Sequence, residues 1–404
     1  MLKFQSFSRA VIKTGLIKAK GLSVHQGAVT IRLDKGKIMR TGLTLIEKLA
    51  RKELVDMVPY QSARRLFSHG NSTIDDAKQT KRKVWLNANE APGKGKYQLS
   101  SNNINRYPDF QPDNLLNAYS DYCGIERLQI LATRGSDEGI ELIIRSFCRA
   151  YQDSILICPP TYGMYAICAE NHGAEVVSVP LQDSSKGMQL NLNALKSQVG
   201  KVKVIFLCSP GNPTGNLLSK EDVITAIELF KGSAIVVIDE AYIEFSPEQT
   251  SIDLLAKYEN AIILRTLSKA FALAGLRCGF TLASKDIITL LNKVIAPYPI
   301  SAPVAEIASK ALNTDLEKMS QRVQACNKQK TTLSTWLSNK KWCSEVFSSD
   351  ANFILFRCIN KQEKQRIFDI LVEKNVFIRD QSKQVWLENC LRISIGSEHE
   401  ITHI

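Results

Sequence analysis

Residues 234–242 read Ala-Ile-Val-Val-Ile-Asp-Glu-Ala-Tyr, five apolar residues followed at once by two carboxylates. Four of the five apolar residues are β-branched, and a short continuous run of this kind is typical of a strand buried on both faces. The same form, an apolar run that ends in polar residues, recurs at 128–137, 204–215 and 261–269.

Helical patterns lie between these runs, at Glu138–Ala150, Thr161–His172 and Ser219–Lys231, and further apolar runs occupy 154–158 and 175–179. Ser219 is a suitable N-cap and Gly173 a suitable C-cap. Strands that alternate with helices predict an α/β fold with a mostly parallel sheet covered by helices. Because ligands bind at the carboxyl ends of such strands, the polar strand ends predict a site there.

The pattern changes after about residue 300, where a long helical region (304–337) precedes short strands at 353–357, 376–379 and 391–395 and a helix at 363–374. This predicts a second, smaller α+β domain. We therefore expect a basic N-terminal extension (1–46), a segment that packs on the small domain and on a dimer partner (47–83), a large domain (84–300) and a small C-terminal domain (301–404).

Most of the net charge of +12 lies in the first 46 residues, which hold nine Lys and Arg residues against one acid, Asp34, a net +8. The rest of the chain is only mildly basic, so we expect no nucleic-acid partner. Three interpretations of residues 1–46 stay open: a start assigned too early, with Met39 as the true beginning; a loosely ordered arm; or an organellar transit peptide.

No stretch approaches the roughly 20 consecutive apolar residues of a membrane span. The ten cysteines form no Cys-x-x-Cys pair and the five histidines are scattered. We therefore expect no membrane association, no metal site and a reducing, cytoplasmic location.

The residue types at the strand ends suit one cofactor, pyridoxal phosphate (PLP). A lysine at a buried strand end, here Lys269, has its pKa lowered by desolvation and becomes a nucleophile for an aldehyde. A carboxylate at a neighbouring strand end, here Asp239, can keep a pyridine nitrogen protonated. Tyr242 and Asn212 can form hydrogen bonds with the ring hydroxyl.

The remaining strand-end residues suit the cofactor's phosphate and ring. The backbone N–H groups of Ser136 and Asp137 open a helix, where a phosphate is favoured. Ser268 and Arg277 can add a hydroxyl and a bidentate cation, and Tyr162 could stack on the ring. Taken singly, each residue could be a cap, a turn or a solvated side chain; their convergence on one sheet edge favours function. The predicted cofactor site comprises Ser136, Asp137, Tyr162, Asn212, Asp239, Tyr242, Thr266, Ser268, Lys269 and Arg277.

Three motifs resemble the signatures of fold-type I PLP aminotransferases: Ser-Pro-Gly-Asn-Pro-Thr-Gly at 209–215, Asp-Glu-Ala-Tyr at 239–242 and Ser-Lys-Ala-Phe-Ala-Leu-Ala-Gly-Leu-Arg at 268–277. Further segments are similar to the histidinol-phosphate aminotransferase branch of that family, namely residues 59–65, 86–90, 105–108, 134–141, 296–299 and 378–381. The likeness runs from about Leu49 to Gly396.

The resemblance implies a homodimer that moves an amino group between histidinol phosphate and 2-oxoglutarate in histidine biosynthesis, with Lys269 as the general base. It implies that Tyr107 reaches the cofactor phosphate of the partner subunit and that Arg392 binds a carboxylate. The substrate phosphate would be contacted by Arg379, Tyr60 and Tyr298.

Two features depart from the family pattern. The basic extension has no counterpart there, and the chain ends soon after Gly396, where the family usually continues into a closing helix. A shortened end would weaken the small domain. Alternative functions are a related PLP decarboxylase acting on an amino-acid phosphate, an aminotransferase for aromatic or acidic amino acids, and a PLP-binding regulator, although the extension shows no helix-turn-helix pattern.

Overall fold

The computed structural model describes residues 19–25, 28–33, 38–41, 83–92 and 104–402, together with Arg51, Leu54, Met57 and Tyr97. The chain divides into residues 1–58 and 59–404, which are described separately. In the first unit, β1 (Ala19–His25), β2 (Ala28–Leu33) and β3 (Ile38–Thr41) form an antiparallel sheet. Much of residues 1–83 lies outside the described residues, so the four-part division of the chain stays a prediction.

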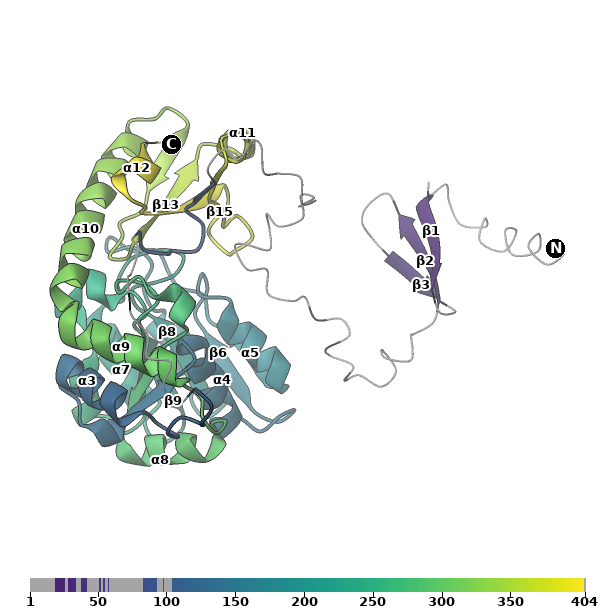
Figure 1. The fold of residues 1–404 in the computed structure, drawn as a ribbon. Coiled ribbons are helices and arrows are strands. Elements are labelled where there is room, and N and C mark those ends of the chain that lie inside the picture. The colour runs from purple at the N-terminus through teal and green to yellow at the C-terminus, as the bar shows by residue number, and fades with distance from the viewer. Residues whose placement is uncertain are drawn as a thin grey trace. The chain divides into compact units, whose positions relative to one another are not determined.

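A seven-stranded sheet forms the centre of the second unit, in the order β5-β11-β10-β9-β8-β6-β7 (Figure 1). Its strands are β5 (Ile130–Thr133), β6 (Ser154–Ile157), β7 (Glu175–Ser178), β8 (Val204–Cys208), β9 (Ile235–Asp239), β10 (Ala261–Thr266) and β11 (Gly279–Ala283). Only β11 runs opposite to the other six strands of this sheet, which confirms the predicted, mostly parallel sheet. The sequence pattern does not predict β11, because Gly-Phe-Thr-Leu-Ala lacks a continuous β-branched run.

Helices cover both faces of this sheet, as the alternation of strands and helices predicts. On one face α4 (Ser136–Phe147), α5 (Met164–His172) and α8 (Lys285–Val294) share an apolar core with Val237 of β9. On the other, α3 (Asp113–Cys123), α6 (Leu192–Lys196), α7 (Lys220–Leu229) and α9 (Ala302–Thr314) pack with Val236 and Ile238 of the same strand. Burial on both faces explains why the strand is apolar throughout.

The predicted caps are confirmed. The Ser219 side chain accepts from the backbone N–H of Asp222, which satisfies one of the free donors at the start of α7. Gly173 ends α5 in the left-handed conformation, at φ 89°. The helix boundaries otherwise shift by a few residues, as helix ends do when side-chain packing decides them.

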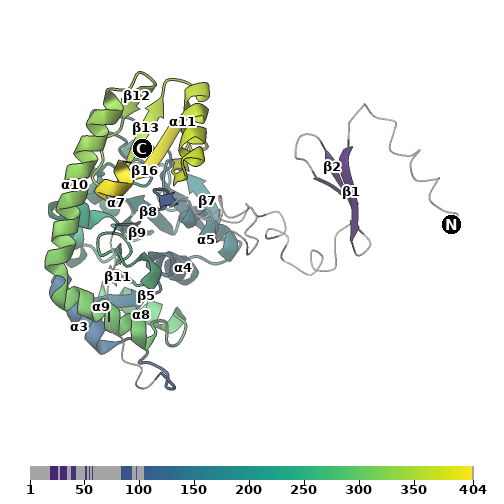
Figure 2. The same cartoon turned by 45° about the horizontal axis from the view of Figure 1, so that its top comes forward.

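A second sheet, in the order β12-β13-β16-β15, has its own apolar core. Its antiparallel strands are β12 (Cys343–Val346), β13 (Phe353–Cys358), β15 (Arg379–Asp380) and β16 (Cys390–Ser394). The helix α11 (Lys361–Glu373) lies beside β16 (Figure 2). A separate pair joins β14 (Val376–Phe377) to β4 (Val84–Trp85), so the strand predicted at 376–379 is two short strands in different sheets. A short helix, α12 (Glu398–Ile401), begins with a capping box at Ser397.

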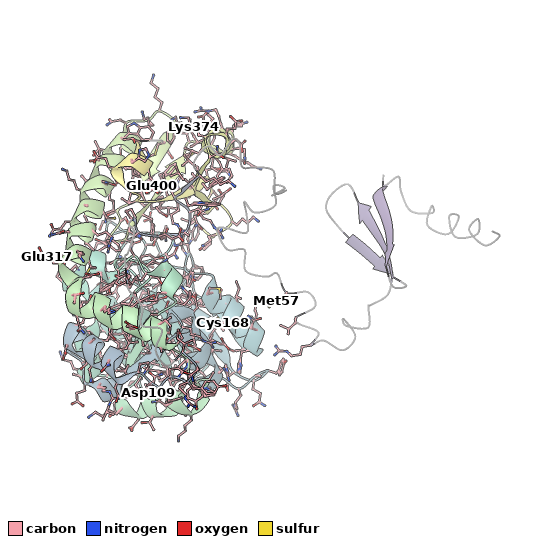
Figure 3. All side chains as sticks on the ribbon, in the orientation of Figure 1. Met57, Asp109, Cys168, Glu317, Lys374 and Glu400 are labelled. Atoms are coloured by element: carbon pink, nitrogen blue, oxygen red, sulfur yellow. The ribbon has the colours of Figure 1, made fainter. Side chains whose placement is uncertain are left out.

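The long helix predicted at 304–337 is two helices, α9 and α10 (Leu316–Ser338). The break falls at Asp315, which leaves the helical conformation (φ −116°, ψ 13°) and whose carboxylate accepts from Lys318 and from the Tyr97 hydroxyl. α10 then runs along the molecule from α9 to β12, with Glu317 extending outward (Figures 1 and 3). No helix within the described ranges is long and apolar enough to cross a membrane.

A buried ion pair joins the ends of β9 and β10. Arg265 lies 2.7 Å from the Glu240 carboxylate and 3.5 Å from that of Glu244, and all three side chains are less than 8% exposed. Burial raises the pKa of Glu244 to about 7. Breaking a buried pair of this kind typically costs about 3–5 kcal/mol, so the contact ties together the two strand ends that carry Asp239 and Lys269.

Candidate active site

A cavity of about 440 Å³ lies where the strands of the large sheet end, and residues from the second sheet complete its wall. It brings together most of the side chains that the sequence predicts: Ser136, Asp137, Tyr162, Asn212, Asp239, Tyr242, Thr266, Ser268, Lys269, Arg277, Arg379 and Arg392. A larger, open hollow of about 810 Å³ lies between residues 178–198 and Trp386 and contains none of them. The chemistry of the lining therefore marks the smaller cavity as the candidate site.

Lys269 follows β10 and enters this cavity. Its Nζ donates to the backbone carbonyl of Ala88 (3.3 Å) and lies 5.4 Å from the centre of the Tyr242 ring. Burial, together with the nearby positive charge of Arg392, lowers its pKa to about 8. An appreciable fraction of the amine is then uncharged near neutral pH, which is the form that attacks a carbonyl carbon.

Asp239, the last residue of β9, is held through both carboxylate oxygens. Tyr165 donates its hydroxyl hydrogen to Oδ2 (2.7 Å), and the backbone N–H of Ala241 donates to Oδ1 (3.1 Å). Burial raises the pKa of this carboxyl to about 6, although both hydrogen bonds act in the opposite direction. A buried carboxylate of this kind would be stabilised by a neighbouring cation such as a protonated pyridine nitrogen.

The sequence gives no signal for Tyr165. Its ring is fully buried and stacks on Phe206, with centroids 4.7 Å apart. In the sequence it resembles any other core aromatic residue on a helix, and only the fold shows that its hydroxyl reaches Asp239.

Tyr242 and Asn212 are neighbours, as predicted. The Tyr242 hydroxyl oxygen accepts from the side-chain amides of Asn89 (3.0 Å) and Asn212 (3.3 Å). Burial raises the pKa of Tyr242. No role is predicted for Asn89, because the sequence shows only that residues 86–90 resemble a family motif. Its left-handed backbone (φ 54°) and its N–H bond to Ser394 fix the amide beside the phenol.

The start of α4 forms a cradle that suits an anion. Gly135 precedes it at φ 77°, a conformation that favours glycine, and a Cβ at that position would lie only 2.5 Å from the Arg277 guanidinium. Arg277 lies 3.2 Å from the Asp137 carboxylate, which also accepts from the Tyr162 hydroxyl (3.0 Å). Free N–H groups at a helix start and an adjacent guanidinium favour a phosphate.

Two hydroxyls stand at the end of β10. Thr266 donates to the Ser268 hydroxyl oxygen (2.8 Å), and its own oxygen accepts from the Ser268 backbone N–H (3.1 Å). Both residues are buried and line the cavity. Their mutual bonds hold the turn that leads into Lys269.

Arg379 and Arg392 are direct partners in the ladder between β15 and β16, and both line the cavity. Arg392 is 7% exposed; it donates to the Asn87 carbonyl (3.1 Å) and to the Asn212 side-chain oxygen. Like charges directly opposite each other on paired strands are unfavourable on their own. An anion bound between them would remove that cost.

Two of the predicted residues within the described ranges do not line the cavity of this chain. Tyr107 and Tyr298 stack on each other, with centroids 4.7 Å apart, and are 82% and 45% exposed. Tyr60 lies outside the described residues. The arrangement of the cavity nevertheless fits PLP, because a strand-end lysine, a buried carboxylate and an anion cradle surround one volume.

Comparisons with known proteins agree with this chemistry. The family model described as aminotransferase class I and II matches residues 66–404. A histidinol-phosphate aminotransferase of Colwellia psychrerythraea is 66% identical over 366 residues, which cover 89% of this chain and 98% of that protein.

Solved structures share the fold. The histidinol-phosphate aminotransferase from Clostridium acetobutylicum has a TM-score of 0.70 at 25% identity, covering 79% of this chain and 96% of that one. The enzyme of the same name from Sinorhizobium meliloti, in complex with pyridoxal-5'-phosphate, has a TM-score of 0.69 at 22% identity. The match covers 79% of this chain and 88% of that one. The chain belongs to the PLP-dependent class I and II aminotransferases, in the histidinol-phosphate aminotransferase family.

Proposed function

We propose that the protein transfers an amino group between L-histidinol phosphate and 2-oxoglutarate, giving imidazole acetol phosphate and glutamate in histidine biosynthesis. The observation that carries this proposal is the pair Arg379 and Arg392 in the same cavity as Lys269. Every substrate of the reaction carries an anionic end, a carboxylate or a phosphate, and the paired guanidinium groups suit either.

The chain's own residues then have distinct tasks. Bound PLP supplies an electron sink for the charge that develops when the substrate Cα–H bond breaks. The Lys269 amine would hold the cofactor at its aldehyde carbon and, when free, would remove the proton from the substrate Cα as general base. Asp239 would keep the ring nitrogen protonated, and Tyr242 with Asn212 would bind the ring hydroxyl.

The remaining residues position the two anions. Ser136, Asp137, Ser268 and Arg277 bind the cofactor phosphate, with Thr266 supporting Ser268, and Tyr162 stacks on the ring. Arg392 binds the α-carboxylate of glutamate. Histidinol phosphate has no carboxylate, so its phosphate occupies that end, where Arg379 contacts it together with Tyr60. Tyr298 does not line this chain's own cavity and would reach the phosphate from a second copy, as Tyr107 would.

We propose a cytoplasmic homodimer. Tyr107 is 82% exposed and does not line this chain's own cavity, which is the arrangement expected if it serves the site of a second copy. A phenol stacked on Tyr298 at the surface would then be covered by the partner.

The first test is the reaction itself. The purified protein, loaded with PLP, should convert histidinol phosphate and 2-oxoglutarate to imidazole acetol phosphate and glutamate, and glutamate alone should convert the bound cofactor to pyridoxamine phosphate. An assay for glutamate follows the first conversion, and the cofactor's absorbance follows the second. Release of carbon dioxide from an amino-acid phosphate, without pyridoxamine phosphate formation, would instead support the decarboxylase alternative.

Asp239→Asn should retain PLP but turn over at least about 10²-fold more slowly, because a neutral amide cannot stabilise a protonated ring nitrogen. Steady-state rates and cofactor absorbance measure the two effects. Asp183→Asn, at an exposed acid outside the cavity, is the matched control. A rate within about threefold of wild type would assign Asp239 another role.

Arg379→Ala should impair the histidinol-phosphate half-reaction more than the glutamate half-reaction. A charge-assisted contact to phosphate contributes about 1.5–3 kcal/mol, or roughly 10- to 150-fold. Single-turnover mixing separates the half-reactions, and Arg366→Ala, an exposed residue of α11, controls for loss of a nearby arginine. Equal losses in both half-reactions would show that Arg379 supports the sheet and does not bind the substrate phosphate.

A further inference from the structure

The strand that carries Arg379 is very short, and one further backbone hydrogen bond, from the Gln381 N–H to the Cys390 carbonyl (3.0 Å), continues its pairing. β15 contains only Arg379 and Asp380 and lies at the edge of its sheet, paired with β16 alone. The preceding strand, β14, belongs to a different sheet. A short edge strand has few ladder hydrogen bonds to specify its register.

The direction of the side chains along this segment decides what lines the cavity. Arg379 and Gln381 both line it, and Asp380, between them, does not. This is the alternation expected of extended backbone. A slip of one residue would turn Arg379 away from the cavity, which would remove one cation of the anion site.

An ion pair on the far side of the strand opposes such a slip. Lys364 of α11 donates its Nζ hydrogen to Asp380 Oδ2 at 2.6 Å, and the other carboxylate oxygen accepts from the Ser382 backbone N–H at 2.8 Å. The Lys364 side chain is only 8% exposed. A lysine is seldom buried without a partner, and leaving one charge of a buried pair alone is costly.

We propose that Lys364 is a positioning residue for substrate selection: its ion pair with Asp380 fixes the register of β15 and so directs Arg379 and Gln381 into the cavity. Lys364 itself does not line the cavity, so it acts through Arg379. This inference rests on the proposed role of Arg379 at the substrate phosphate.

The kinetic test uses the PLP-loaded full chain. Lys364→Met keeps the aliphatic stem and removes the charge; it should raise the KM for histidinol phosphate roughly tenfold, the scale of one charge-assisted contact. The kcat and the glutamate half-reaction should stay within about twofold. Lys361→Met, at an exposed position of the same helix, is the control. Asp380→Asn, nearly isosteric and at a side chain 38% exposed, should give the same pattern if Lys364→Met does not fold.

A double-mutant cycle tests whether Lys364 acts through Arg379. Added to Arg379→Ala, Lys364→Met should raise the KM no further, because the group that it positions is already absent. Additive effects, equal losses in both half-reactions, or a KM unchanged in both Lys364→Met and Asp380→Asn would overturn the inference.

A crystal structure of Lys364→Met separates this inference from the proposed function. Arg379 displaced from the cavity supports the positioning role, whatever substrate the enzyme uses. Arg379 retained in the cavity would refute it, even if Arg379→Ala confirms the phosphate role. An Arg379→Ala variant that impairs both half-reactions equally would instead refute the proposed role of Arg379 at the substrate phosphate.

Discussion

The site depends on the burial of a few charged groups at the carboxyl edge of one sheet. Parallel strands end together, so Asp239 and Lys269 reach one cavity from neighbouring strands although thirty positions separate them in sequence. Burial moves both pKa values toward neutrality, to about 6 for the carboxyl and about 8 for the amine. The same desolvation thus favours the uncharged, nucleophilic form of the lysine and destabilises the carboxylate unless a cation lies beside it. PLP chemistry requires both properties.

An ion pair and several hydrogen bonds hold these residues in place. The buried Arg265–Glu240 pair joins the ends of β9 and β10, close in sequence to Asp239 and Lys269. On the opposite wall, Arg392 is fixed by the Asn87 carbonyl and by Asn212, which also donates to Tyr242. Hydrogen bonds therefore connect Arg392, from the second sheet, to Tyr242 through Asn212.

Local patterns predict much of the fold and most of the residues that line the cavity. The apolar run before Asp239 and the N-cap at Ser219 are visible in the sequence because burial and capping restrict which residues can occupy them. The contacts of Tyr165 and Asn89 are not visible, since each depends on packing between segments far apart in the chain. The break at Asp315 and the division of 376–379 into two strands follow from tertiary contacts as well, which override a local pattern.

The central claim is that Lys269 is the residue that bonds covalently to PLP. Borohydride reduction of the PLP-loaded protein, followed by proteolysis and mass mapping, tests it directly. The account predicts a single pyridoxyl group, on Lys269, in the peptide that follows β10. A pyridoxyl group on any other lysine, with Lys269 unlabelled, would contradict it.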